Sequence, residues 1–230
     1  MRINYRSIEA FEQLSDYSIK NLENVSEIYK LPMGTPILKD NFIPNKIIII
    51  LSGEARLIHS SILGFETICK IKSNSFVGLA SLLCANGCEP ISSSNDVIAL
   101  SIPDKEILNL YSNDLNFKQW CNSKVFEGEI LKISKILFER SSQADSLSIK
   151  KITQKLIKYG TIQIIENKQI IEIEDDVKYI LSSSNLLGKN IGDILTTKVE
   201  LESNNENPIR IVKISNNVFD ELFNIDNKID

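Results

Sequence analysis

Residues 76–83 read FVGLASLL, which begins as a glycine turn and opens into a short apolar helix. Runs of branched residues with the character of strands lie on both sides of it. Residues 46–60, KIIIILSGEARLIHS, are broken by Ser52-Gly53, and residues 92–103, SSSNDVIALSIP, end at a proline. Short strands at regular spacing with turn signals between them favour a barrel or a jelly roll.

The flanking residues extend this prediction to an α+β fold with two domains. Two short helices, residues 8–14 and 16–25, are expected before the first strand, with Ser15-Asp16 as a helix cap. We predict that residues 1–140 form a double-stranded β-helix, or jelly roll, with flanking helices and a long final helix. Residues 145–230 are expected to form a small strand-rich α+β domain.

The order of these segments resembles the cyclic-nucleotide-binding β-roll of catabolite-activator and Fnr-type regulators. The resemblance covers roughly residues 8–140. It implies that Gly34 and Gly53 lie at turns where a positive φ is cheap only for glycine. It also implies that Phe76-Val77-Gly78 opens a phosphate-binding cassette. The segments that carry it are FEQLSDYSIKNLENVSEIYKLPMGTPIL, IIIILSGEARL, SFVGLASLL and NDVIALSIPDKEI, in that order.

The cassette lacks the charges that the resemblance implies for a cyclic phosphate. The family uses a glycine and a helix N-terminus for the phosphate, a carboxylate after that glycine for the ribose, and a later arginine. Here Leu79 stands where the acid is expected, and residues 84–97, CANGCEPISSSNDV, contain no arginine. Glu89, in that stretch, has the wrong sign for a phosphate. Because a desolvated charged pair contributes strongly to affinity, we expect no ordinary binding of cAMP or cGMP.

Two interpretations of the pocket stay open: an empty structural roll, or a pocket retuned for another small ligand. The candidate ligand contacts are Gly78, Leu79, Ala80, Ser92 and Ser93. The serine hydroxyls would suit a neutral polar ligand, but serines also occupy solvated strand edges. No cofactor is predicted.

Residues 116–140 are predicted to form one long helix. An apolar seam runs along it at spacings of four, three and four, through Phe126, Ile130, Ile133 and Leu137. The resemblance implies that this helix makes a homodimer interface. The alternative is that the seam packs only on the protein's own β-roll.

The residues that follow do not read as a helix-turn-helix. A polar linker precedes an amphipathic helix, SIKKITQKLIKYG, that ends at Gly160. TIQIIENKQIIEIED reads as a β-hairpin around Asn167-Lys168, and VKYILSSS, TKVELE and IRIVKIS read as strands before a final helix, Asn217 to Phe223. VKYILSSSNLLGKNIGDIL also echoes IIIILSGEARL, which is a faint internal repeat.

Composition excludes several classes of function. The net charge of −4, from 26 basic and 30 acidic residues, argues against an obligate nucleic-acid or anionic-membrane surface. Four cysteines without a CxxC pair and a single histidine, His59, predict neither a metal site nor an enzyme active site. The apolar runs are too short to span a membrane, and the N-terminus lacks the apolar region of a signal peptide, so a cytoplasmic protein is expected.

We therefore predict a non-enzymatic regulatory or sensory module with a degenerate cyclic-nucleotide-binding-like pocket, which acts through protein partners. The alternative is a catabolite-activator or Fnr-type transcriptional regulator that binds DNA through its C-terminal domain. The whole pattern also resembles the N-terminal regulatory region of certain cyanobacterial peptide-exporting ABC transporters. A homodimer or a membrane transporter is the expected partner, without direct insertion of this chain into the membrane.

Overall fold

Eight strands of the N-terminal half form two four-stranded antiparallel sheets, in the orders β1-β8-β3-β6 and β2-β7-β4-β5. The computed structural model describes residues 3–61, 64–141, 148–166, 169–196, 199–200 and 208–223. This arrangement confirms the predicted jelly roll, which we call roll 1. Its strands are β1 Glu27–Leu31, β2 Pro36–Leu38, β3 Lys46–Ser52, β4 Ala55–Ser61, β5 Gly64–Ile71, β6 Phe76–Val77, β7 Ile91–Ser93 and β8 Val97–Pro103.

The strand β3 shows why this sequence makes a roll. Ile47 and Ile49 pack with the helices outside the roll, whereas Ile50 packs with the residues inside it. Because neighbouring side chains on a strand point to opposite faces, a continuous isoleucine run is buried on both. Gly34 and Gly53 adopt positive φ angles of 81° and 88° between strands, as predicted.

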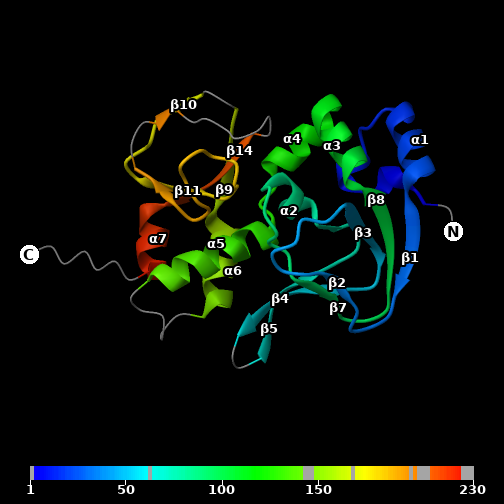
Figure 1. Ribbon diagram of the computed structural model, residues 1–230, viewed down its shortest axis with the longest axis horizontal. Helices are drawn as coiled ribbons and strands as arrows, with labels where there is room; N and C mark the ends of the chain where they lie inside the picture. Colours follow the sequence, from blue (N-terminus) through cyan, green and yellow to red (C-terminus); the bar gives the residue numbers. More distant parts are fainter. Residues whose placement is uncertain are drawn as a thin grey trace, which may run out of the picture.

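Helices cover one face of roll 1 (Figure 1). α1 (Asp16–Val25) is capped by Ser15, whose hydroxyl accepts a 3.1 Å hydrogen bond from the backbone N–H of Ser18. The helix expected over residues 8–14 is instead two 3₁₀ turns, η1 (Tyr5–Ser7) and η2 (Glu9–Phe11), because Ile8 between them is extended. α3 (Asp104–Asn113) follows β8 directly.

The single long helix predicted over residues 116–140 is wrong. The structure has α4 (Leu115–Ser123) and α5 (Glu127–Arg140), separated by residues with extended backbone. Phe126 has φ −92° and ψ 132° at the break, and its ring is 9% exposed. The break turns this ring inward, where it contacts Trp120 with ring centroids 6.4 Å apart. Burial of Phe126 therefore outweighs the continuation of the helix.

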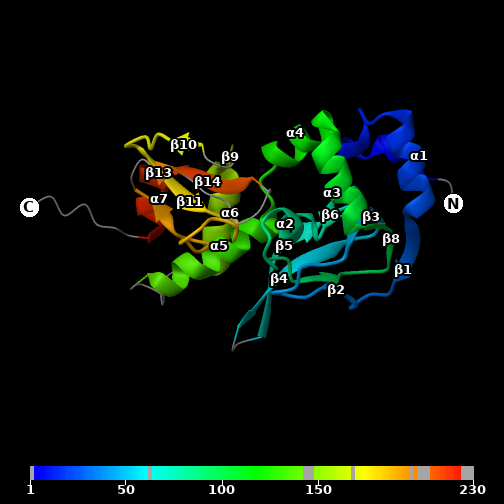
Figure 2. The ribbon, with the colours of Figure 1, turned by 45° about the horizontal axis from the view of Figure 1, so that its top comes forward.

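The C-terminal part of the chain forms a second, smaller set of strands beside α5 (Figure 2). A four-stranded antiparallel sheet has the order β12-β11-β14-β9, and β10 pairs with β13. We call this domain roll 2. It follows α6 and ends with α7, so the predicted helix before it, the strands and the final helix are confirmed in outline. Its elements are α6 Ile149–Tyr159, β9 Thr161–Ile165, β10 Ile170–Ile171, β11 Val177–Leu181, β12 Ile194–Leu195, β13 Val199–Glu200, β14 Ile209–Ser215 and α7 Asn216–Phe223.

Roll 2 repeats the hydrogen-bonding order of roll 1. Read from the other edge, β9-β14-β11-β12 matches β1-β8-β3-β6. In roll 1 the Ile50 N–H donates to the Ser75 carbonyl at 3.1 Å, and the Asn74 N–H donates back to Ile50 at 2.7 Å. In roll 2 Leu181 exchanges the same two bonds with Asp193 and Gly192, at 2.9 and 2.8 Å. The first strand of the sequence echo is therefore repeated in the structure, whereas its second strand, β12, corresponds to β6 and not to β4.

The repeat explains one prediction that is wrong. β9 and β10 do not form a hairpin with each other, since β9 pairs with β14 and β10 pairs with β13. They correspond to β1 and β2, which also lie in different sheets. The predicted turn at residues 167–168 lies outside the described residues, as do residues 142–147 of the predicted linker SSQADSLS (141–148) and all of the predicted strand TKVELE (197–202) except residues 199–200.

Roll 2 is abbreviated at the position of the cassette. Residues 78–90, which include α2 (Leu79–Leu83), join β6 to β7 in roll 1. In roll 2 only residues 196–198 join β12 to β13. Residues 182–193, between β11 and β12, form no counterpart of the β4–β5 hairpin.

Candidate functional site

The glycine turn of residues 76–83 is held in place by strand β6. Phe76 and Val77 pair with Ile49 and Ile48 of β3. Gly78 follows with φ +94° and starts α2. A Cβ atom at Gly78 would lie 2.6 Å from Cγ of Pro44, so both the backbone angle and the available space require glycine. The strand, glycine and short helix of the predicted cassette are therefore all present.

The two candidate ligand residues after this glycine are buried. Leu79 and Ala80 are 0% exposed and belong to the apolar cluster between the sheet and the outer helices. The apolar side chain of Leu79 thus occupies the position where the resemblance implies a ribose-binding acid.

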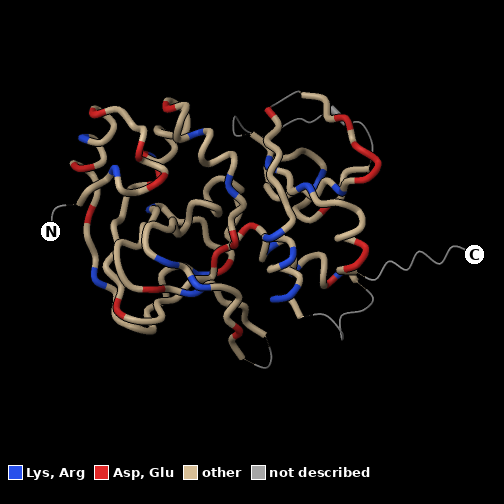
Figure 3. Tube along the Cα trace, turned by 180° about the vertical axis from the view of Figure 1, so that it is seen from behind, with Lys and Arg blue, Asp and Glu red and all other residues tan. Residues whose placement is uncertain are grey.

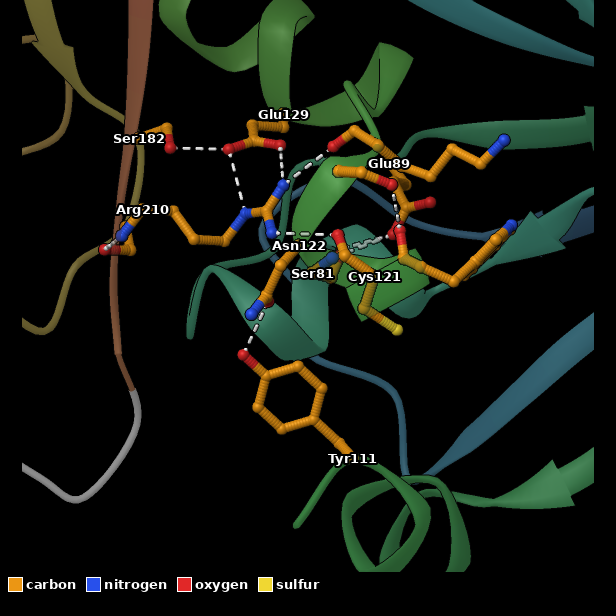
Figure 4. Close-up of polar contacts among 12 residues, drawn as sticks. Ser81, Glu89, Tyr111, Cys121, Asn122, Glu129, Ser182 and Arg210 are labelled. Atoms are coloured by element: carbon orange, nitrogen blue, oxygen red, sulfur yellow. Dashed lines mark hydrogen bonds and ion pairs between the residues drawn. The ribbon is translucent and has the colours of Figure 1, made fainter. Parts of the chain in front are cut away.

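The amino-terminal end of α2 is bonded to a carboxyl group of the same chain. Glu89 Oε2 accepts hydrogen bonds of 2.9 Å from the backbone N–H and from the hydroxyl of Ser81 (Figure 4). Burial raises the pKa of Glu89 to about 7, although the hydrogen bonds from Ser81 oppose that rise. Helix N-termini attract anions through their free N–H groups. The N–H and the hydroxyl of Ser81 are thus already bonded to a carboxyl group of this chain.

Helix α5 closes the space behind Glu89. Gly128 packs so tightly there that an added Cβ would lie 2.3 Å from Cγ of Glu89 and 3.1 Å from the carbonyl oxygen of Cys88. Glu89 is 4% exposed as a result. The glycine within the helix, which costs helical stability, allows this close approach.

Ser92 and Ser93 bond to the backbone of the turn before β2. The Ser93 hydroxyl donates to the Pro32 carbonyl at 2.7 Å and accepts from the Thr35 N–H at 2.8 Å. The Ser92 hydroxyl donates to the Thr35 carbonyl at 3.2 Å. Ser93 is fully buried. The assignment of these serines as ligand contacts stays a prediction, and both hydroxyls already have partners within the chain.

A buried ion pair joins roll 2 to α5 beside the cassette. Arg210 on β14 and Glu129 on α5 are 2% and 1% exposed. Arg210 Nε donates to Glu129 Oε1 at 3.1 Å, and Nη2 donates to Oε2 at 3.0 Å (Figure 4). Burial alone would lower the pKa of Arg210, but the charge of Glu129 raises it above its ordinary value. The guanidinium also donates to the carbonyls of Cys121 and Lys124, near the end of α4.

The serines after β11 complete this junction. Ser182 donates a hydrogen bond to Glu129, and the Ser183 hydroxyl accepts one of 3.0 Å from the Arg210 N–H. The Ser184 N–H donates to the carbonyl of Cys84, at the end of α2, at 3.0 Å. Roll 2 therefore touches both α5 and the cassette helix of roll 1.

The predicted dimer seam is buried within one chain. Ile130, Ile133 and Leu137 pack with α6, α7 and the sheet of roll 2, and they are at most 6% exposed. Phe126 belongs to the helical cluster of roll 1. The homodimer stays a prediction. Within the chain, these three seam residues pack against roll 2 and not against roll 1.

The described residues hold no group of three or more histidine, cysteine or acidic side chains that could bind a metal ion. Cys84 and Cys88 are free thiols, and burial raises the pKa of both well above the ordinary value. A raised pKa disfavours the reactive thiolate. In the described part of the chain, no helix combines the length and apolar character needed to cross a bilayer.

No protein-family model matches the sequence, and no curated protein matches it. Several solved structures are similar to the chain. One is the sensor domain of the transcriptional regulator DNR from Pseudomonas aeruginosa, with 15% identity, a TM-score of 0.46, and coverage of 62% of this chain and 92% of that one. A putative cyclic nucleotide-binding protein from Geobacter metallireducens has 22% identity, a TM-score of 0.44, and coverage of 51% and 89%.

A third similar structure matches a larger share of this chain. The regulatory domain of Toxoplasma gondii PKA, crystallised with cAMP, has 12% identity and a TM-score of 0.44, and the match covers 95% of this chain and 88% of that one. Binding of cAMP is a property of that protein.

Sequence reasoning missed the ion pair at the junction. Arg210 interrupts the apolar strand IRIVKIS, and an arginine inside such a strand is a signal for a buried partner. Glu129 lies directly before Ile130 of the apolar seam. Nothing in the local pattern joins the two residues, which are 81 positions apart.

Proposed function

We propose that this chain is a non-enzymatic regulatory module whose nucleotide-type pocket is closed by its own residues and which acts through protein partners. One observation carries the proposal: Glu89 accepts the hydrogen bonds of Ser81 at the start of α2. A cyclic phosphate would have to displace this carboxyl group from the N–H and the hydroxyl of Ser81.

Two further observations support a closed pocket. Leu79 and Ala80 fill the start of α2 with buried apolar side chains. Among the cavities in the described part of the chain, five have volumes of up to about 490 Å³, and none of these five is lined by Gly78, Leu79 or Ala80.

Isothermal titration with cAMP and with cGMP tests the closed pocket. We expect no heat of binding at micromolar nucleotide, with an established cyclic-nucleotide-binding protein as the positive control. Micromolar or tighter binding to the wild-type chain would contradict the proposal. Titration of the Glu89→Gln variant then reports whether the carboxyl charge alone prevents binding.

A DNA-binding regulator is the alternative function. A helix-turn-helix needs two adjacent helices, but α6 and α7 are separated in the sequence by the strands of roll 2. Basic and acidic residues both occur over each of the two rolls (Figure 3). A gel shift on the upstream region of its own gene at two salt concentrations tests the alternative, since binding to phosphates weakens with salt.

The proposed partners are proteins, and a transporter is one candidate. Its support is the resemblance of the sequence pattern to the regulatory regions of peptide-exporting ABC transporters. A pull-down with the chain against a transporter encoded by a neighbouring gene tests this candidate.

A further inference from the structure

A polar groove of about 490 Å³ lies between α1 and α3 of roll 1 (Figure 1). Its floor is apolar, since Leu22 and Leu110 line it and are only 2% and 7% exposed. Its walls carry the amides of Asn21, Asn109 and Asn113, with carboxyl groups and hydroxyls beside them. Among the described residues that line it there is no lysine, arginine or histidine. An anionic ligand would therefore meet no counter-charge from these side chains.

The structural repeat relates α1 to α6 of roll 2. Each of these helices precedes the first strand of its roll, and their last turns make the same hydrogen bond. The Ser26 N–H donates to the Leu22 carbonyl at 3.0 Å, and the Gly160 N–H donates to the Leu156 carbonyl at 2.8 Å. Leu22 therefore corresponds to Leu156.

The same repeat relates α3 to α7. Each of these helices follows the last strand of its roll, and their first residues make the same hydrogen bond. The Asp104 N–H donates to the Asn45 carbonyl at 3.0 Å, and the Asn216 N–H donates to the Asp176 carbonyl at 2.9 Å. Asp104 therefore corresponds to Asn216.

Roll 2 carries an ion pair where roll 1 carries two amides. Lys155 of α6 and Glu221 of α7 form this pair, which bridges the two helices. Counted from the matched residues, the same places in α1 and α3 are taken by Asn21 and Asn109. No hydrogen bond joins these two described residues. The gap that an ion pair bridges in roll 2 is therefore open in roll 1.

The polar groups of the groove offer both hydrogen-bond donors and acceptors. Nδ2 of Asn113 donates to Oδ1 of Asn109 at 2.7 Å, which leaves Nδ2 of Asn109 as a donor and Oδ1 of Asn113 as an acceptor. The side chains of Asn21 and Glu106 make no hydrogen bond to another described residue. Because a hydroxyl group both donates and accepts a hydrogen bond, a ligand rich in hydroxyls would satisfy this mixed set.

An exposed aromatic ring adds a second kind of contact. Tyr17, in the first turn of α1, lines the groove and is 75% exposed. The face of an aromatic ring carries a partial negative charge, and the C–H groups on one side of a sugar ring carry a partial positive charge. A sugar therefore matches the groove twice, through its hydroxyls at the amides and through its C–H groups at Tyr17.

We infer that the groove between α1 and α3 binds a neutral mono- or disaccharide. The three amides would bond to its hydroxyls, Glu106 would accept a hydrogen bond from a further hydroxyl, and the Tyr17 ring would cover one face of a sugar ring. The inference goes beyond the proposed function, because the groove shares no residue with the cassette. It gives the regulatory module a ligand site outside its closed pocket.

Saturation-transfer difference NMR on the full chain with maltose, cellobiose, lactose and sucrose tests the inference. We expect at least one of these sugars to receive saturation from the protein and to bind with millimolar or tighter affinity in a titration. The absence of saturation transfer to all four sugars at millimolar concentration overturns the inference.

A double variant closes the groove with the ion pair of roll 2. Asn21→Lys with Asn109→Glu should weaken sugar binding about tenfold or more, since the hydrogen bonds of two amides are lost. Asn24→Lys with Ser112→Glu is the matched control, because both positions are exposed on the same helices and do not line the groove. This control should bind like the wild type. Circular dichroism checks that both variants fold, and unchanged binding to the closed variant contradicts the site.

A single exposed substitution tests the aromatic contact without risk to the fold. Tyr17→Ala should weaken sugar binding about fivefold, as expected for the loss of one ring contact. Tyr17→Phe keeps the ring and should retain most of the affinity. Equal binding to the wild type and to Tyr17→Ala would show that the sugar lies elsewhere.

Spermidine is the probe for a cationic occupant. Binding of spermidine that Glu106→Gln abolishes, together with no binding of the sugars, would show a site for cations and overturn the inference. Failure of the proposed function would look different: cyclic nucleotide binding in the titration contradicts the closed pocket without changing sugar binding between α1 and α3.

Discussion

Arg210 of β14 and Glu129 of α5 form a doubly hydrogen-bonded ion pair that excludes water, with N···O distances of 3.1 and 3.0 Å. Gly128, the residue before Glu129, lies against the Glu89 side chain that is bonded to α2. One turn of α5 therefore contacts the cassette of roll 1 on one side and the sheet of roll 2 on the other.

Loss of one partner of the ion pair should strongly destabilise the protein. Arg210→Met leaves the Glu129 carboxylate buried without its counter-ion, so we expect the free energy of unfolding to fall by about 3–5 kcal/mol. The double variant Arg210→Met with Glu129→Leu should recover most of that loss. Urea denaturation of the set measures the effect. Arg6→Met, which breaks the exposed Arg6–Asp16 pair, is the control and should cost less than about 1 kcal/mol.

Gly128→Ala should destabilise the protein although alanine is the better helix former. The added Cβ would overlap Cγ of Glu89, at 2.3 Å, and such overpacking costs about 1–3 kcal/mol. In a Glu89→Ala background, which removes Cγ, the same substitution should cost less. A double-mutant cycle from urea denaturation gives the coupling energy, and a value near zero would contradict the packing described.

The stability of the chain should depend on pH through Glu89. Burial raises the pKa of Glu89 to about 7 in the folded protein, from the 4.5 of an ordinary glutamate side chain. The folded state therefore binds the proton more tightly than the unfolded state does. The contribution of Glu89 to the free energy of unfolding is complete below pH 4.5 and is lost as the pH rises to about 7. Within this window the free energy of unfolding should fall by up to about 1.4 kcal/mol per pH unit.

The variant Glu89→Gln isolates this effect, because glutamine has no proton to lose. His59 is present in both proteins, so its contribution cancels in the difference between them. The difference in unfolding free energy between wild type and variant should change with pH in this window. Chemical denaturation at several pH values measures it, and parallel curves would show that Glu89 titrates normally.

The cysteines should react slowly with a thiol reagent in the native protein. Burial raises the pKa of Cys69 and Cys121 to about 12, and it also raises the pKa of Cys84 and Cys88. We expect little reaction at pH 8 and all four thiols to react in denaturant. Rapid labelling of Cys84 and Cys88 in the native state would contradict this expectation, since both thiols are buried.

Local sequence patterns predicted the parts of the fold that depend on neighbouring residues. The strand periods, the cap at Ser15, the turns at Gly34 and Gly53, and the glycine before α2 all follow from short-range geometry. The absence of an arginine from residues 84–97, directly after α2, is also visible in the sequence alone. These features depend on backbone angles and on side-chain alternation, which a few adjacent residues determine.

Tertiary structure decided which groups meet. It brought Glu89 to the start of α2, paired Arg210 with Glu129, broke the helix at Phe126 and assigned β9 and β10 to different sheets. Periodicity tells which face of a segment is buried but not which distant segment buries it. That choice depends on the summed packing and hydrogen bonding of residues far apart in the chain, so it is made only when the whole chain folds.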